Sequence, residues 1–246
     1  MGTAHTMKLI FRGTRGNIDC ASRRHRMHSA LLIAVTRRRI MIDCGTDWRS
    51  RLRAIRPDAI LVTHAHPDHA GGLDGGAPCP VYATRKTWAI MASYPLNQRR
   101  VLEARCPIQI HGLVVEAFPV IHSLRAPAVG FRLSGDGAAI FYVPDVVNIH
   151  ARRAALRGAK LFVGDGAALT RPIVHRRGSR LFGHTTIRAQ LGWCVQAGIA
   201  SAIFTHCGSE IVAADTRTMP ARVREMGEER GVDARIAYDG LEVRVD

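Results

Sequence analysis

Short apolar runs, separated by polar turns and amphipathic stretches, recur along the chain. Apolar runs bounded by turn residues are typical of buried strands, and apolar positions spaced three and four apart indicate helices. The pattern predicts strands at 7–11, 29–35, 39–43, 59–63, 113–120, 127–133, 138–143, 160–163, 201–205, 234–237 and 241–245. It predicts helices at 47–55, 85–92, 149–156, 185–197 and 216–230, the fourth starting at Thr185 or Thr186 as N-cap and ending at Gly198. This alternation, without repeat or linker, predicts an α/β protein with one domain over residues 1–246.

Four metal-binding side chains directly follow one of these strands. From the last residue of the strand at 59–63, the sequence reads Thr63-His64-Ala65-His66-Pro67-Asp68-His69. His64 and His66 are two residues apart, so in extended backbone they point to the same side. Pro67 suits the first position of a helix, which would carry Asp68 and His69 in its first turn. Imidazole and carboxylate together favour zinc, with manganese or iron as alternatives. A polar loop that is rich in histidine by chance is the competing interpretation.

Length and composition restrict the class of protein. The 246 residues are 47% hydrophobic, which is enough for a large core. No apolar run is long enough for a membrane helix, and the start from Met1 to Lys8 has no apolar segment of signal-peptide length. We therefore expect a cytoplasmic protein without membrane contact, although a precursor whose signal has been removed would look the same. Six cysteines without a C-x-x-C pair indicate reduced, mostly buried thiols.

The formal net charge is +15, and only three of the 35 basic residues are lysine. An arginine-biased genome would scatter such charges over the surface. An anionic substrate would also explain them, because guanidinium presents a fork that matches phosphate. Composition leaves both explanations open.

The H-x-H-x-D-H pattern of residues 64–69 resembles the metallo-β-lactamase superfamily, and other segments fit it in order. Ile42-Asp43-Cys44-Gly45 resembles the turn whose aspartate supports the site. The ends of three later strands, at 118–123, 142–145 and 204–206, resemble those that carry the remaining ligands. The resemblance implies a four-layer αββα sandwich with two divalent metal ions, zinc first and manganese second. It implies that His64, His66 and His122 hold the first metal, that Asp68, His69 and His206 hold the second, and that Asp145 bridges them.

Such a site implies hydrolysis. Two nearby cations lower the pKa of a bridging water, so that hydroxide is available near neutral pH, and they neutralise charge in the transition state. The imidazoles need their second nitrogen anchored, which we expect of Asp43 and of Asp165. Asp165 lies between Gly164 and Gly166, so a turn-forming role fits it equally well.

Two segments, 11–17 and 183–206, resemble the ribonuclease Z and cyclic phosphodiesterase branch of the superfamily. The resemblance implies that His184 is catalytic together with Asp68, and that it contacts the phosphate or protonates the leaving oxygen. A helix-capping histidine is the alternative. His66 stands where di-iron oxygen-reducing members carry an acidic residue, which argues against redox chemistry. Asp145 stands where β-lactamases use cysteine, which argues against antibiotic hydrolysis.

The placement of arginines bears on the substrate. Arginines follow the glycine-rich start, follow His122, and lie in an expected loop near the site over 171–180, whose part in substrate binding the sequence leaves open; they are Arg15, Arg23, Arg24, Arg26, Arg125, Arg171, Arg176, Arg177 and Arg180. We expect most to be solvated and a few near the metals to bind phosphate. No insertion is long enough for the arm with which ribonuclease Z grips transfer RNA.

We therefore predict a metal-dependent phosphodiesterase that uses a two-metal-bridged hydroxide on a small cyclic or linear anionic phosphodiester. A nuclease acting on RNA or DNA, a thioester or lactone hydrolase on the same metals, and a metal-stabilised binding module without turnover are the alternatives. The sequence leaves a homodimer open.

Overall fold

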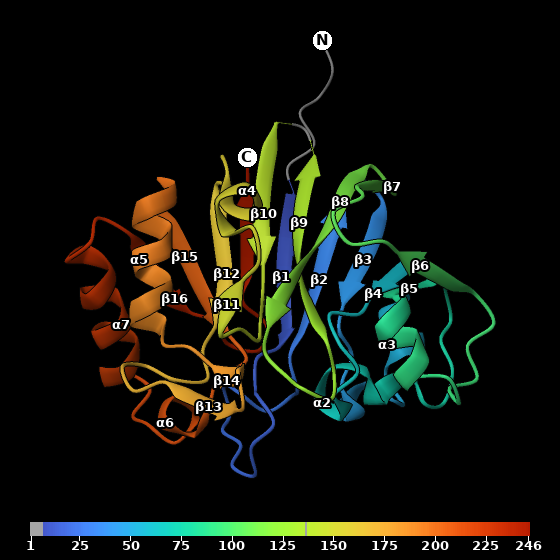
Figure 1. Cartoon of the computed structure of the whole chain (residues 1–246), viewed down its shortest axis with the longest axis horizontal. Coiled ribbons are helices and arrows are strands. Elements are labelled where there is room, and N and C mark those ends of the chain that lie inside the picture. The colour runs from blue at the N-terminus through green and yellow to red at the C-terminus, as the bar shows by residue number, and fades with distance from the viewer. Residues whose placement is uncertain (1–6, 136) are drawn as a thin grey trace.

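Two mixed β-sheets pack face to face at the centre of the molecule (Figure 1). The computed structural model describes residues 7–135 and 137–246. The first sheet has seven strands in the order β17-β1-β2-β3-β4-β5-β6. They are β1 (Met7–Gly13), β2 (Ala30–Val35), β3 (Arg38–Ile42), β4 (Ala59–Leu61), β5 (Val81–Thr84), β6 (Arg99–Leu102) and β17 (Glu242–Val245).

The second sheet has eight strands. Seven follow the order β11-β8-β9-β10-β12-β15-β16, and β7 pairs with β8. They are β7 (Ile108–Ile110), β8 (Leu113–Ile121), β9 (Ala128–Gly135), β10 (Ala138–Tyr142), β11 (Asn148–Ile149), β12 (Leu161–Asp165), β15 (Ser201–Thr205) and β16 (Asp233–Ile236). β10, β12 and β15 run parallel, so their carboxyl ends meet at one edge of the sheet.

Helices cover the outer face of each sheet, which completes the predicted αββα sandwich. The first sheet is covered by α1 (Leu52–Ile55), α2 (Pro67–Ala70) and α3 (Arg85–Ile90), together with the 3₁₀ turns η1 (Thr46–Trp48) and η2 (Gly71–Leu73). The second is covered by α4 (Arg152–Leu156), α5 (Ile187–Ala197), α6 (Ser209–Val212) and α7 (Thr218–Glu228). Figure 1 shows the two helical layers on opposite sides of the paired sheets.

Successive side chains of a strand point to opposite faces of its sheet, so one strand can contribute to the core between the sheets and to the core under the helices. In β2, Leu31 and Ile33 face the second sheet, while Leu32 packs among the helices of the first. Phe131 of β9, which is fully buried, fills the space between the sheets from the other side. The strands are therefore apolar on both faces, which is why the sequence shows continuous apolar runs there.

Most predicted elements are confirmed, with shifted ends. Helix α5 has Thr186 as N-cap, whose hydroxyl accepts a bond from the Ala189 N–H at 3.0 Å, and it ends at Gly198 in the left-handed conformation. The helix predicted from residue 149 starts only at Arg152, because residues 148–149 pair with β8 as β11. The single helix predicted over 47–55 is divided into η1 and α1.

The expectation of a loop over 171–180 is wrong. These residues belong largely to a hairpin of β13 (Ile173–Arg177) and β14 (Arg180–His184), which pair only with each other. β13 is mostly exposed, so its sequence lacks the apolar alternation that identifies a strand resting on a core. The short strands β5, β6, β7 and β11 and helix α6 also escaped prediction, because two to four residues hold too little pattern.

Within residues 7–135 and 137–246, no helix combines the length and apolarity needed to span a membrane. Residues 1–6, which include most of the segment judged to lack a signal peptide, lie outside the described residues. The prediction of one domain over 1–246 stays a prediction. Four of the six cysteines are buried, and all six are free thiols.

Candidate metal centre

The predicted ligands lie where strands end and loops begin. His122 directly follows β8, His206 directly follows β15, and Asp145 comes three residues after β10. His64 follows β4, and Pro67 opens α2, whose single turn carries Asp68 and His69. Because the carboxyl ends of these strands converge, residues far apart in the sequence meet at one edge of the sandwich.

Three histidines form one group of convergent nitrogens. His66 Nδ1 lies 2.9 Å from His64 Nε2 and 3.3 Å from His122 Nε2. His64 is fully buried and His122 nearly so. Three imidazole nitrogens that face a common point are the ligand set of many zinc sites.

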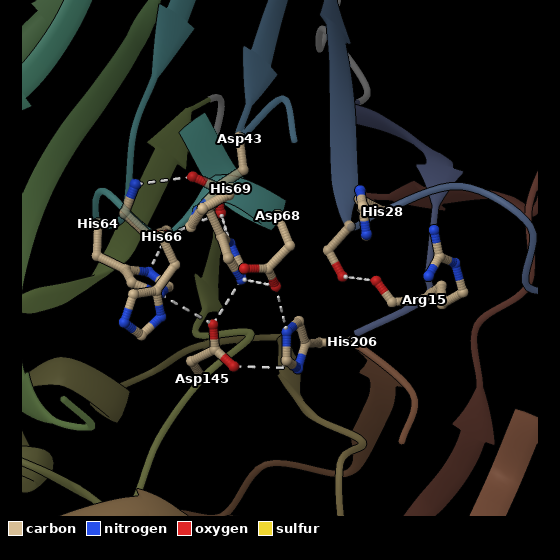
Figure 2. Close-up of polar contacts among 12 residues, drawn as sticks. Arg15, His28, Asp43, His64, His66, Asp68, His69, Asp145 and His206 are labelled. Carbon is tan, nitrogen blue, oxygen red and sulfur yellow. Dashed lines mark hydrogen bonds and ion pairs between the residues drawn. The ribbon is translucent and has the colours of Figure 1, made fainter. Parts of the chain in front are cut away.

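A second group contains Asp68, His69 and His206. Asp68 Oδ2 lies 3.1 Å from both His69 Nε2 and His206 Nε2. Asp145 joins the two groups, since its Oδ2 is 2.6 Å from His69 Nε2 and 3.4 Å from His64 Nε2, and its Oδ1 is 3.0 Å from His206 Nδ1. Figure 2 shows Asp145 reaching toward these histidines from the side opposite Asp43. The structure thus brings all seven predicted ligands together.

The donor set fits cations rather than a hydrogen-bonded polar core. Both oxygens of Asp145, Asp68 Oδ1, His69 Nε2 and His206 Nδ1 are buried without a hydrogen-bond partner among residues 7–135 and 137–246. Buried polar groups are almost always paired, and unpaired charges are costly, so atoms of this kind that face one another indicate a metal-binding arrangement.

The pKa shifts of five predicted ligands agree with metal binding. His69 is the exception, because the carboxylates of Asp68, Asp145 and Asp43 outweigh burial and raise its pKa. Burial lowers the pKa of His64, His66 and His122, that of His122 to about 4, so these imidazoles are neutral as ligands must be. Burial alone would raise the pKa of Asp68 and Asp145, but His69 and His206 outweigh it and lower both. Both carboxylates are therefore ionised near neutral pH.

Asp43 supports the second group, as predicted. Its Oδ2 lies 2.9 Å from His69 Nδ1 and accepts the Thr63 hydroxyl at 2.8 Å, and its Oδ1 accepts the Thr63 N–H at 2.8 Å. Asp43 has φ 60° and His206 has φ 53°, a conformation that costs a non-glycine residue about 1–2 kcal/mol. Both residues directly follow a strand, and the left-handed conformation turns their side chains into the site, which is why this local cost is tolerated.

Two glycines are required by close backbone approach. A Cβ on Gly45, in the Ile42–Gly45 turn, would meet the carbonyl oxygen of Asp68 at 2.2 Å. A Cβ on Gly183 would meet the carbonyl oxygen of Ile173 at 1.9 Å, and φ there is +113°. The Gly183 N–H donates to the His122 carbonyl at 2.7 Å, and its own carbonyl lies 3.1 Å from His122 Nδ1. The hairpin backbone therefore holds both the main chain and the ring of His122.

His184 lies beside the seven ligands at the end of β14. Its Nδ1 is 2.8 Å from Asp165 Oδ2 and 3.4 Å from Asp145 Oδ1. Burial by itself lowers the pKa of His184, but the Asp165 carboxylate outweighs it and raises the pKa to about 9. His184 is thus held as a hydrogen-bond donor, and the helix cap is Thr186 instead.

Asp165 supports a site side chain and also shapes a turn. Besides His184, its carboxylate accepts the N–H groups of Val146 and Ala167. The side chain of Gln190 on α5 bonds both the N–H and the carbonyl of Asp165, at 2.8 and 2.7 Å. Asp165 therefore shapes a turn, as one interpretation predicted, and the imidazole that it anchors is His184, which is not one of the seven predicted ligands.

Sequence reasoning missed three supporting groups. Ser123 Oγ lies 3.2 Å from His66 Nε2, Gln190 fixes Asp165, and the Gly183 carbonyl orients His122. A signal existed for Gln190 alone, because it is a polar residue on the buried face of α5. Of the predicted arginines, Arg15 bonds Asp47 and the Ile18 carbonyl, and Arg24 stacks over Tyr238, so their guanidinium groups already have partners.

An αββα sandwich with a histidine and aspartate cluster at one edge of its sheets defines a metal-dependent hydrolase. Residues 38–207 match the family model described as the beta-lactamase superfamily domain. The chain belongs to this superfamily.

Relatives and solved structures agree with this assignment. A ribonuclease Z from Mycobacterium bovis is 23% identical over 208 residues, covering 68% of this chain and 74% of that protein. The metallo-beta-lactamase fold protein YhfI from Bacillus subtilis superposes with a TM-score of 0.76 at 15% identity, over 98% of this chain and 100% of that one. A diphosphatase from the PhnP family superposes with a TM-score of 0.68 at 19% identity, over 98% and 97% of the two chains.

Replacing Asp43 with alanine should weaken both the site and the fold. Asp43→Ala leaves the His69 nitrogen and the Thr63 N–H unpaired inside the protein and breaks a buried pair, so we expect a loss of about 3–5 kcal/mol in unfolding free energy. Metal affinity should fall about 10–100-fold. Urea unfolding and competition with a chelator measure the two effects.

Asp233→Ala is the control, because Asp233 pairs with Arg235 at an exposed position. We expect this substitution to change the unfolding free energy by less than about 1 kcal/mol and to leave metal affinity unchanged. If both variants behave alike, Asp43 does not support the site.

Proposed function

We propose that the protein is a phosphodiesterase with two metals. His64, His66 and His122 would hold the first, Asp68, His69 and His206 the second, and Asp145 would bridge them. The observation that carries the proposal is the position of Asp145, whose two buried oxygens face histidines of both groups. Zinc suits this donor set first, and manganese second.

When bound, two divalent cations supply positive charge for phosphate oxygens and make water more acidic. The chain's own residues supply orientation: Asp43 and Ser123 fix the rings of His69 and His66. Asp68 would contribute to the reaction as a carboxylate that holds the second metal. His184 would protonate the leaving oxygen, with Asp165 holding its Nδ1 so that the ring keeps its direction.

Three observations favour phosphodiesters over β-lactams, thioesters and lactones. The carboxylate of Asp145, where β-lactamases use cysteine, argues against β-lactams. Related proteins are named ribonuclease Z and diphosphatase, which favours phosphate esters over thioesters and lactones. Arg171 and Arg180 line cavities beside the site, which suits an anionic substrate. The net charge of +15 also supports a second candidate, a nuclease acting on RNA or DNA, whose affinity would fall steeply with salt.

The substrate class is tested with a panel on metal-analysed protein. Bis(p-nitrophenyl) phosphate should be hydrolysed well ahead of a β-lactam and a thioester at matched metal content. Preference for either of the latter would refute phosphodiester chemistry, while rapid cleavage of long RNA or DNA would favour the nuclease.

The shared carboxylate is tested through metal content. Wild-type protein should contain two transition-metal ions per chain by elemental analysis, and Asp145→Asn should lose at least one of them, because the substitution removes a negative charge between two cations. Turnover should fall with the metal. An Asp145→Asn protein that keeps two metals and near wild-type rates would show that Asp145 does not bridge.

The role of His184 is tested with two leaving groups. His184→Ala should keep two metals while kcat falls about 10²–10⁴-fold on a nucleotide ester, whose leaving oxygen needs a proton. The loss should be smaller on a nitrophenyl ester, whose leaving group needs none. Equal, small losses would make His184 structural, and loss of metal would make it a ligand.

A further inference from the structure

Two separate cavities adjoin the candidate metal centre, and the β13–β14 hairpin borders both. The larger, about 660 Å³, is lined by His122 of the first ligand group and by Arg180 of the hairpin. The smaller, about 380 Å³, is lined by His206 of the second group, by His184, and by Ile173 at the start of the hairpin. A ligand centred on the metals could therefore extend into both.

The larger cavity has an excess of positive charge. Arg85, Lys86 and Arg180 line it, together with a single carboxylate, Glu103. Arg85 Nε donates to Glu103 Oε1 at 2.7 Å, so this pair neutralises itself. Among the described residues, Lys86 and Arg180 form no ion pair.

Most of the other residues lining the larger cavity are apolar, including Leu102, Val129 and Leu181. A cavity lined by both cations and apolar side chains suits an organic group that carries its own anionic substituent.

Apart from His184, which is paired with Asp165 at 2.8 Å, the smaller cavity is lined by equal numbers of positive and negative side chains. It contains one arginine, Arg171, and one carboxylate, Glu210, whose Oε2 accepts the Leu169 N–H at 3.3 Å. A second phosphate would gain little there, because the carboxylate opposes the guanidinium. The two cavities thus differ in both size and charge.

We infer that the natural substrate is a linear phosphodiester whose two ester groups occupy the two cavities, and whose group in the larger cavity carries a further phosphate. The inference rests on the proposed function. A cyclic diester has both ester oxygens in one ring, so it would leave one cavity empty. In the reaction a water oxygen bonds to phosphorus, one ester P–O bond breaks, and the released oxygen takes a proton, which gives a phosphomonoester and an alcohol.

The test compares three substrates of related chemistry on the metal-loaded protein. These are the dinucleotide ApA, its 5′-phosphorylated form pApA, and 3′,5′-cyclic AMP. The value of kcat/KM should be about tenfold or more higher for pApA than for the other two. Lys86→Ala and Arg180→Ala should each raise KM for pApA about tenfold, with kcat unchanged, and change KM for ApA less than about twofold.

Two exposed residues outside both cavities provide matched controls. Lys160→Ala serves for Lys86→Ala. Arg177→Ala serves for Arg180→Ala, because Arg177 is the cross-strand partner of Arg180 on the same hairpin. Neither control should alter the preference for pApA.

Equal effects of Lys86→Ala and Arg180→Ala on pApA and ApA, or faster hydrolysis of cyclic AMP than of pApA, would overturn the inference. Bis(p-nitrophenyl) phosphate separates this failure from failure of the proposed function. If the wild type cleaves that ester but Lys86→Ala and Arg180→Ala do not change the preference for pApA over ApA, the inference alone is wrong. If the wild type cleaves no phosphodiester, the proposed function is wrong and the inference falls with it.

Discussion

The buried carboxylate of Asp145 is the group on which the rest of the site depends. Its two oxygens have no hydrogen-bond donor in the part of the chain that the structure describes, and they face histidines that follow strands of both sheets. A charge in that position is tolerable only when positive charge compensates it, since an isolated buried carboxylate costs several kcal/mol. Residues that follow strands of the two sheets therefore meet around a carboxylate whose negative charge requires cations nearby.

The fold meets this requirement by ending its strands in one place. Parallel pairing of β10, β12 and β15 sets the carboxyl ends of these strands side by side, and with them Asp145, Asp165 and His206. From the first sheet, β3 and β4 are parallel and bring Asp43 and His64 to the same edge. The site thus needs no dedicated element, because it is a consequence of strand direction in two packed sheets.

Support for the reactive side chains extends outward from this edge into the core. Gln190 is buried on α5 and fixes the backbone of Asp165, which in turn holds His184. On the other side, the β13–β14 hairpin fixes His122 through the backbone of Gly183 and carries Arg180 into the larger cavity. The same short hairpin therefore links the metal centre with the surface that would select a substrate.

From local features, the sequence predicted an α/β protein and the four side chains at 64–69, because apolar strand runs and a compact ligand pattern are legible without tertiary information. Its resemblance to the superfamily supplied the αββα arrangement, the other three ligands and the role of Asp43. The tertiary structure alone decided the roles of Ser123 and Gly183, the hairpin over 173–184, and the difference between the two cavities. These depend on backbone approach and on pairing between exposed segments, and neither leaves a periodic pattern in the chain. Lys86 and Arg180 illustrate the reason: they are 94 positions apart in the sequence, and only the packing of α3 near the hairpin brings them to one cavity.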